Sequence, residues 1–194
     1  MRADRMIAFT DAVLAIIITI LVLGLERPAE LSFDGFWELR TSFFAYCLSF
    51  FWIGSVWITL NIIWENVEQV SRKIVWWNLV FLFFASFLPY ATGLVSLNFD
   101  DRFAQAFYGI IVITTTTCNL ILHKLIDSPN SDNSDLLDTT KAYRRLLLPD
   151  IFIKIISLVL ALTVYPPIMM YGVLTAAGYF QLAKIIFLKR KKFT

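Results

Sequence analysis

The sequence is poor in the residue types on which most catalytic and metal sites depend. It contains one histidine, His123, and two cysteines among its 194 residues. A zinc site needs several nitrogen, sulfur or carboxylate ligands at close spacing, and a nucleophilic triad needs an acid, a histidine and a nucleophile together. Neither pattern occurs in the sequence, and the glycine-rich loops that bind phosphates are also missing. We therefore expect that the protein is not an enzyme and binds no cofactor or metal.

Charge is scarce as well. Charged residues make up 16% of the chain and hydrophobic residues 58%, and the mean hydropathy is +0.69. This composition excludes an ordinary soluble domain. Both Cys47 and Cys118 fall inside apolar segments, so a disulfide framework is not expected. The composition instead predicts an integral membrane protein whose partner is the lipid bilayer, with no nucleic-acid partner.

Long apolar runs divide the chain into six segments. A helix needs about 20 mostly apolar residues to cross a bilayer, and the runs of suitable length are roughly 7–25, 36–64, 74–97, 103–125, 146–165 and 168–188. We expect an all-α integral membrane protein with six transmembrane helices, in a single domain over residues 1–194. The link Tyr165-Pro166-Pro167 is so short that the last two helices are predicted to form an antiparallel hairpin.

Two features of the segment ends refine this prediction. Residues 127–135 form a polar loop, after which Asp135 or Asp138 is expected to cap a short amphipathic helix that leads into the fifth segment. The first segment has the hydropathy of a secretory signal, but Asp11 interrupts it and no small-x-small cleavage site follows. We expect this first helix to be retained.

The placement of lysine and arginine predicts the orientation. With six spans both termini lie on one side, and that side collects 14 of the 17 basic residues, Lys154 and Lys184 among them. The other side keeps only Arg27, Arg40 and Arg102. The positive-inside rule therefore places both termini in the cytoplasm. The basic run 189–192 is expected to anchor the chain at anionic lipid.

An acid inside the first apolar segment is the most unusual feature of the chain. A carboxylate in the membrane is costly unless a partner or water meets it, and Asp11 lies six residues after Arg5, too far for an i,i+4 pair. Asp11 therefore needs partners on other helices, or it is an interfacial acid that reaches headgroup water. The candidate partners are Thr59, Asn61, Trp76, Trp77 and Asn78.

A stripe of branched aliphatic residues follows this acid. Ile16, Ile20 and Leu23 are spaced i, i+4 and i+7, which places them on one face of a helix with Thr19 at its edge. If several copies of this helix faced one axis, the stripe would form stacked apolar rings, and such rings block ions by dewetting. The alternative is that the stripe packs against neighbouring helices.

The start of the chain resembles a known family. Arg5, Phe9, Thr10 and Asp11 match the Arg-x-x-x-Phe-Ser-Asp signature in the first helix of the endosomal/lysosomal potassium channel family, transmembrane protein 175. Residues 76–79 and 86–90 also resemble the third helix of that family. The bacterial members carry one six-helix repeat per chain, and the animal members carry two.

The resemblance implies a function and a site. It implies a homotetrameric cation channel, permeable to potassium ions with a modest preference over sodium, in which the first helix of each subunit lines the pore. The gate would be formed by Ile16, Ile20 and Leu23, with Thr19 as a polar pore-lining residue. A structural network that fixes the first helix would include Arg5, Phe9, Thr10, Asp11 and Asn78.

Two departures from the family pattern stand out. Thr10 replaces the signature serine, which keeps the hydroxyl but adds a methyl group and restricts the side chain. Many relatives also carry histidines one turn after the tryptophan of the second helix, whereas Trp57 is followed here by Leu60 and Asn61. Any part that those histidines play in gating is therefore not carried over to this chain.

Two other functions remain open from the sequence. One is a non-conducting membrane scaffold, in which Arg5 and Asp11 are purely structural, and the other is a proton-coupled transporter that uses Asp11. A single repeat with no targeting segment favours a prokaryotic plasma membrane over an organelle.

Overall fold

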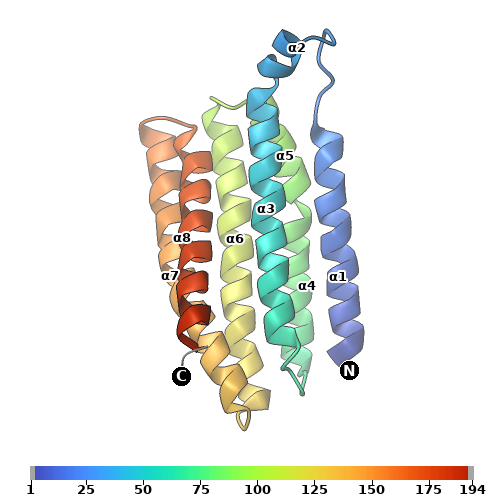
Figure 1. Ribbon diagram of the computed structural model, residues 1–194, viewed down its shortest axis with the longest axis vertical. Helices are drawn as coiled ribbons and strands as arrows, with labels where there is room; N and C mark the ends of the chain where they lie inside the picture. Colours follow the sequence, from blue (N-terminus) through green and yellow to red (C-terminus); the bar gives the residue numbers. More distant parts are fainter. Residues whose placement is uncertain (1–2, 192–194) are drawn as a thin grey trace.

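The computed structural model describes the backbone of residues 3–191 and the side chains of residues 4–186. The fold is all-α, as predicted, with its helices running roughly parallel in one bundle (Figure 1). The helices and short 3-10 turns are α1 (Ala3–Ile20), η1 (Leu21–Gly24), α2 (Phe33–Glu38), α3 (Arg40–Trp64), α4 (Arg72–Ser86), α5 (Leu88–Leu97), α6 (Arg102–Asp127), η2 (Ser128–Asn130), α7 (Ser134–Thr163) and α8 (Ile168–Lys191).

Within the described residues, five helical stretches are long and apolar enough to cross a bilayer. They are Asp4–Gly24, Arg40–Trp64, Arg72–Leu97, Arg102–Asn130 and Ser134–Thr163. Each of the five overlaps one of the first five predicted segments. The sixth predicted segment corresponds to α8, which follows α7 after a short link and lies beside it as the predicted antiparallel hairpin (Figure 1). The basic run 189–192 lies outside the residues whose side chains are described.

The prediction that the second span starts at residue 36 is wrong. A separate short helix, α2, occupies residues 33–38, and the long helix α3 begins only at Arg40. The Ser32 hydroxyl accepts a hydrogen bond from the Gly35 amide at 3.1 Å, which starts α2 on its own cap. Hydropathy did not reveal this break because α2 is itself rich in aromatic residues.

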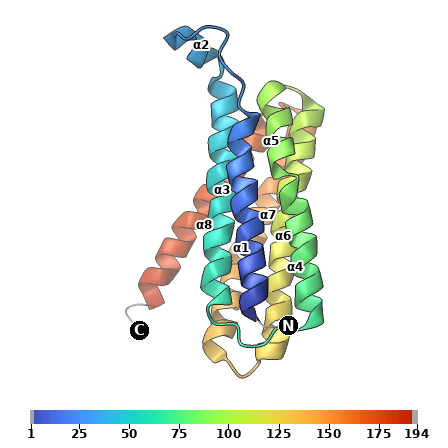
Figure 2. The same ribbon diagram turned by 90° about the vertical axis from the view of Figure 1, so that its right-hand side faces the viewer.

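The third span is divided at Phe87 into α4 and α5. Proline has no amide hydrogen, so Pro89 cannot donate to the carbonyl four residues earlier. The Ser86 hydroxyl donates to the Phe83 carbonyl at 2.7 Å just before the break. The proline therefore interrupts the span without ending it, because α5 continues along the bundle (Figure 2).

The predicted cap of the fifth helix is also wrong. The Asn133 side chain, and neither Asp135 nor Asp138, accepts the hydrogen bond from the Leu136 amide, at 3.0 Å. The helix α7 then runs without a break through the expected amphipathic segment into the apolar one. An asparagine in the preceding polar loop caps a helix as well as an aspartate does, so residue types alone could not choose between them.

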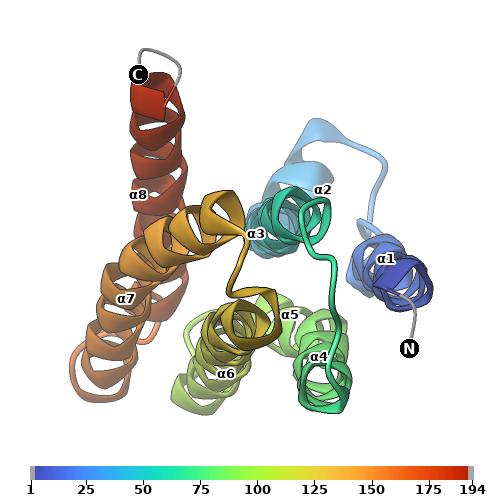
Figure 3. The same cartoon turned by 90° about the horizontal axis from the view of Figure 1, so that it is seen from below.

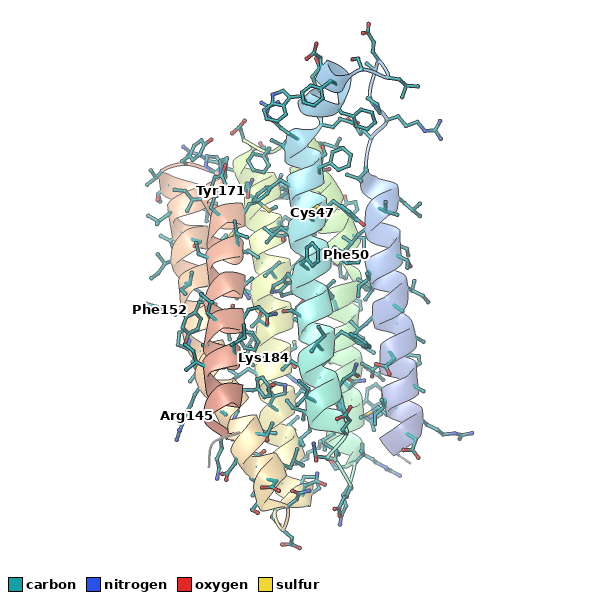
Figure 4. All side chains as sticks on the ribbon, in the orientation of Figure 1. Cys47, Phe50, Arg145, Phe152, Tyr171 and Lys184 are labelled. Atoms are coloured by element: carbon teal, nitrogen blue, oxygen red, sulfur yellow. The ribbon has the colours of Figure 1, made fainter. Side chains whose placement is uncertain are left out.

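The order of the helices across the bundle places α1 and the α7–α8 hairpin at opposite edges. Seen from below, α1 stands apart at one edge, α3 and α6 lie centrally, and α8 splays away on the far side (Figure 3). The divergence of α8 from α3 opens an apolar groove of about 790 Å³, whose wall includes Cys47 and Phe50 of α3 (Figure 4). Both cysteines are free, as expected.

The hairpin depends on one close approach of its two helices. A Cβ atom added at Gly172 in α8 would overlap the Ser157 side chain in α7, whereas one added at Gly178 would meet nothing within 4 Å. We predict that Gly172→Ala lowers the melting temperature by roughly 5 °C, because overpacking costs about 1–3 kcal/mol. The measurement is thermal unfolding in detergent, with Gly178→Ala as the matched control that leaves the melting temperature unchanged or slightly raised.

Candidate functional site

The helix α1 presents two different faces. One face, which continues into η1 at Leu21, is buried against α3, α4 and α5, and its members are 4% exposed or less: Met6, Thr10, Leu14, Ile17 and Leu21. These residues recur at helical spacing, so they hold one side of α1 against the rest of the chain. The opposite side of α1 is left uncovered by the described residues of this chain.

The predicted stripe lies on the uncovered side. Ile16, Ile20 and Leu23 are 56%, 43% and 78% exposed, and all three line one open groove of about 550 Å³ beside Pro89 and Tyr90 of α5. The end of this segment is a 3-10 turn, in which residues three apart eclipse each other. Leu23 therefore stands almost directly above Ile20, which makes the stripe straighter than an α-helical wheel predicts.

Thr19 lies on the same open side of α1. Its hydroxyl donates to the Ile16 carbonyl at 2.9 Å, and the side chain is exposed. Because the hydroxyl hydrogen is used within the helix, the threonine oxygen keeps its acceptor capacity free for a group outside the helix. The open face therefore combines three aliphatic side chains with one outward-facing oxygen.

Asp11 has a partner that was not among those proposed from the sequence. The Trp57 indole nitrogen, in α3, donates to the Asp11 carboxylate at 2.9 Å. Asp11 is half-buried and Trp57 is 38% exposed, so the contact lies at the edge of the α1–α3 interface. The carboxylate thus points toward α3, and the contact joins the middle of α1 to the second half of α3.

A second polar contact ties the same turn of α1 to α4. The Asn78 amide donates to the Thr10 hydroxyl oxygen at 2.8 Å, and the Thr10 hydroxyl donates to the Met6 carbonyl at 2.8 Å. Thr10 and Asn78 are both nearly fully buried. Two of the five predicted network residues are therefore in direct contact.

The other members of the predicted network are placed differently. Arg5 and Phe9 lie on the exposed side of α1, and Phe9 is 50% exposed. None of the ion pairs among the described residues includes Arg5. Within one chain, the motif therefore divides into the buried Thr10 and half-buried Asp11 on one side and the exposed Arg5 and Phe9 on the other.

A buried ion pair in α7 was also missed. Lys154, which the sequence assigned to the side of the termini, lies in the middle of α7 and is 1% exposed, with its ammonium 2.6 Å from the Asp150 carboxylate. Its spacing of i,i+4 from Asp150 was the available signal. Lys184 is also buried, 5.9 Å from the Tyr143 ring. Neither lysine therefore contributes its charge to a loop.

No metal site was found in the part of the chain that the structure describes, where no group of three or more histidine, cysteine, aspartate or glutamate side chains converges. The threonine-rich stretch of α6 faces the other helices of the bundle. Thr115 and Thr116 are buried, and the Thr116 hydroxyl donates to the Val112 carbonyl at 2.8 Å. These threonines lie among the packed helices, away from the open face of α1.

The chain is similar to known channels in sequence and in fold. The family model described as endosomal/lysosomal potassium channel TMEM175 matches residues 5–89. The chain is 35% identical over 136 residues to a curated potassium channel from Chryseobacterium sp. (strain P1-3), with 70% of this chain and 71% of the relative covered. It is 30% identical over 120 residues to one from Streptomyces collinus, with 58% of each covered.

A solved structure is similar in fold. The crystal structure of a lysosomal potassium-selective channel TMEM175 homolog from Chamaesiphon minutus matches with a TM-score of 0.72, covering 93% of this chain and 96% of that one. The sequence identity in this comparison is 23%. The similarity therefore supports the arrangement of the helices over nearly the whole chain.

The hydrogen bond between Trp57 and Asp11 makes a testable contribution to stability. We predict that Trp57→Phe and Asp11→Ala each lower the free energy of unfolding by about 1–3 kcal/mol, because each leaves one polar group without its partner. The double variant should lose clearly less than the sum of the two, which a double-mutant cycle by thermal or denaturant unfolding measures.

Trp76→Phe is the matched control, since Trp76 lies on α4 and is 70% exposed, whereas Trp57 is 38% exposed. It should leave the unfolding free energy nearly unchanged. Strictly additive losses in the Trp57 and Asp11 cycle would contradict a direct interaction between the two side chains.

Proposed function

The chain belongs to the TMEM175 family of potassium channels, and from this premise we propose that four copies form a passive potassium pore lined by α1. The observation that carries the proposal is the uncovered aliphatic stripe of Ile16, Ile20 and Leu23. One chain supplies one such helix, so a pore requires an oligomer. A homotetramer of six-helix subunits, with α8 as the sixth span, closes the open face of α1 around an axis.

The mechanism is diffusion down the electrochemical gradient through a narrow apolar constriction. An ion must shed or compress its hydration shell to pass a ring of isoleucine side chains, and such a ring gates by dewetting. Potassium holds its water less tightly than sodium does, so the constriction gives a modest preference for potassium. Thr19 supplies a ring of hydroxyl oxygens between the aliphatic layers.

The polar contacts at the base of α1 position the helix and do not touch the permeating ion. Asp11 lies five residues before Ile16, and five steps of about 100° turn the helix by roughly 140° net. The hydrogen bond from Trp57 directs the carboxylate toward α3, which agrees with this rotation. Thr10 and Asn78 brace the same turn against α4, and Arg5 and Phe9 are available to neighbouring subunits.

The proposed setting is a prokaryotic plasma membrane with both termini in the cytoplasm. Removing Lys154 and Lys184 from the count leaves 12 basic residues on the side of the termini, against three on the other. The asymmetry still favours cytoplasmic termini by the positive-inside rule. A partly buried ion pair between Arg144 and Asp127, at 2.6 Å, lies on the same side.

A liposome flux assay tests this function against its rivals. Purified protein should carry potassium faster than sodium and should not carry chloride, with a rate that follows the potassium gradient. A scaffold predicts no flux above empty liposomes. A proton-coupled transporter predicts saturable flux that depends on a proton gradient and is lost in Asp11→Asn.

The stripe assignment predicts a selectivity phenotype. Ile16→Asn should wet the constriction, raise both potassium and sodium flux and reduce the discrimination between them. Ile18, about 200° away around the helix, lines the groove beside α3, and Ile18→Asn should change selectivity much less. A loss of selectivity in the Ile18 variant, with none in the Ile16 variant, would show that the wrong face was assigned.

If Asp11 only positions α1, its removal should weaken assembly of the tetramer without changing ion selectivity. Asp11→Ala should lower the yield or heat resistance of the tetramer on size-exclusion chromatography, because α1 loses its tie to α3. The channels that still assemble should keep a near-normal reversal potential with potassium on one side and sodium on the other. A stable tetramer with an altered reversal potential would place Asp11 in the ion path.

A further inference from the structure

An ion pair lies in the middle of α7, far from the helix ends. Asp150 and Lys154 are 3% and 1% exposed, and the ammonium lies 2.6 Å from the carboxylate. Charges inside a membrane span are costly and persist only when their remaining hydrogen-bond capacity is met. The surroundings of this pair therefore have to supply polar partners.

Lys154 joins three helices. Besides Asp150 in its own helix, the ammonium donates to the Thr116 hydroxyl in α6 at 3.0 Å, and it lies 5.2 Å from the centre of the Trp52 ring in α3. An ammonium has three donors, and an aromatic face attracts a cation at this distance. The charge of Lys154 is thus met by a carboxylate, a hydroxyl and an indole face.

A small cavity adjoins the pair and has one polar atom left over. The cavity has a volume of about 20 Å³, and its walls include Asn119, Asp150 and Lys154. Asn119 is 2% exposed, and its side-chain oxygen has no hydrogen-bond partner among the described residues. A buried amide oxygen without a donor is destabilising, so this atom points to a ligand that donates a hydrogen bond.

The size and charge of the cavity restrict what that ligand can be. About 10–15 Å³ is enough for one water molecule, and a cavity of about 20 Å³ provides that room. The ammonium of Lys154 repels a cation, and the carboxylate of Asp150 repels an anion. A neutral molecule with two donors fits, since both Asn119 and Asp150 offer acceptor oxygens.

We propose that this site binds one ordered water molecule, which donates to the Asn119 oxygen and completes a polar cluster with Asp150, Lys154 and Thr116. The cluster ties α7 to α6 and α3 in the interior of the membrane. The helix α7, which carries Asp150 and Lys154, stands on the side of the bundle away from α1 (Figure 3). The cluster is therefore separate from the proposed pore.

A structure of the full protein in lipid, at a resolution that shows buried water, is the direct test. The expected result is density in this cavity within hydrogen-bond distance of the Asn119 oxygen, and its absence in Asn119→Leu, whose apolar side chain fills the space. A wild-type map that shows other buried waters but none beside Asn119 would overturn the proposal.

Variants of the Asp150–Lys154 ion pair test whether the cluster is shielded from bulk water. Lys154→Met should lower the melting temperature by roughly 10 °C, because it leaves a buried carboxylate unpaired, and the double variant Asp150→Leu with Lys154→Met should recover most of that loss. A single variant that melts like the wild type would show that bulk water reaches Asp150, which contradicts an enclosed site.

Potassium flux separates this proposal from the proposed function. The double variant should conduct potassium in liposomes at the wild-type rate, because no member of the cluster lies on α1. A well-folded double variant without flux would place the cluster in the conduction path and overturn its separation from the pore. Absence of flux in the wild type would instead contradict the channel and leave the water site standing.

Discussion

The hydrocarbon core of a bilayer offers no hydrogen-bond partners, and this constraint decides where the polar side chains of the protein lie. Hydroxyl groups donate hydrogen bonds to carbonyls of their own helix, as Thr116 does to the Val112 carbonyl. Stronger groups are paired across helices, as Asp11 is with Trp57 of α3 and as Lys154, which also pairs with Asp150 in its own helix, is with Thr116 of α6. An unpaired polar group in this medium costs several kcal/mol, so each pairing also fixes how two helices meet.

The pairings at the base of α1 give the helix its two roles. The contacts of Asp11 and Thr10 with α3 and α4 lie on or near the buried side, where Leu14, Ile17 and Leu21 continue the packing toward the other end. Because the polar ties and the apolar packing share one side, the other side stays open among the described residues of the helix. A helix held in this way can face an axis of symmetry without losing its attachment to its own subunit.

Hydropathy predicted most of the fold because a bilayer sets a minimum length for every span. It failed where local caps decide the ends: Ser32 starts α2 as a separate helix, and Asn133 starts α7 well before its apolar part. Spacing placed Ile16, Ile20 and Leu23 on one face of the first helix, and the family resemblance singled out that face, but neither identified the partner of Asp11. Which tryptophan reaches Asp11 depends on how α1 crosses α3, and no pattern within either helix encodes that crossing. Lys154 was misplaced for a related reason, since a count of basic residues takes no account of Asp150, the acid one turn before it.

The claim that α1 faces the ion path can be tested by chemical modification of a single cysteine. In a background with Cys47→Ala and Cys118→Ala, the Leu23→Cys protein should lose its potassium current when a charged thiol reagent is added, because the reagent would occupy the ring above Ile20. Ile18→Cys, on the side facing α3, should conduct as before under the same treatment. A Leu23→Cys current that survives complete modification, together with block of Ile18→Cys, would contradict a pore lined by this stripe.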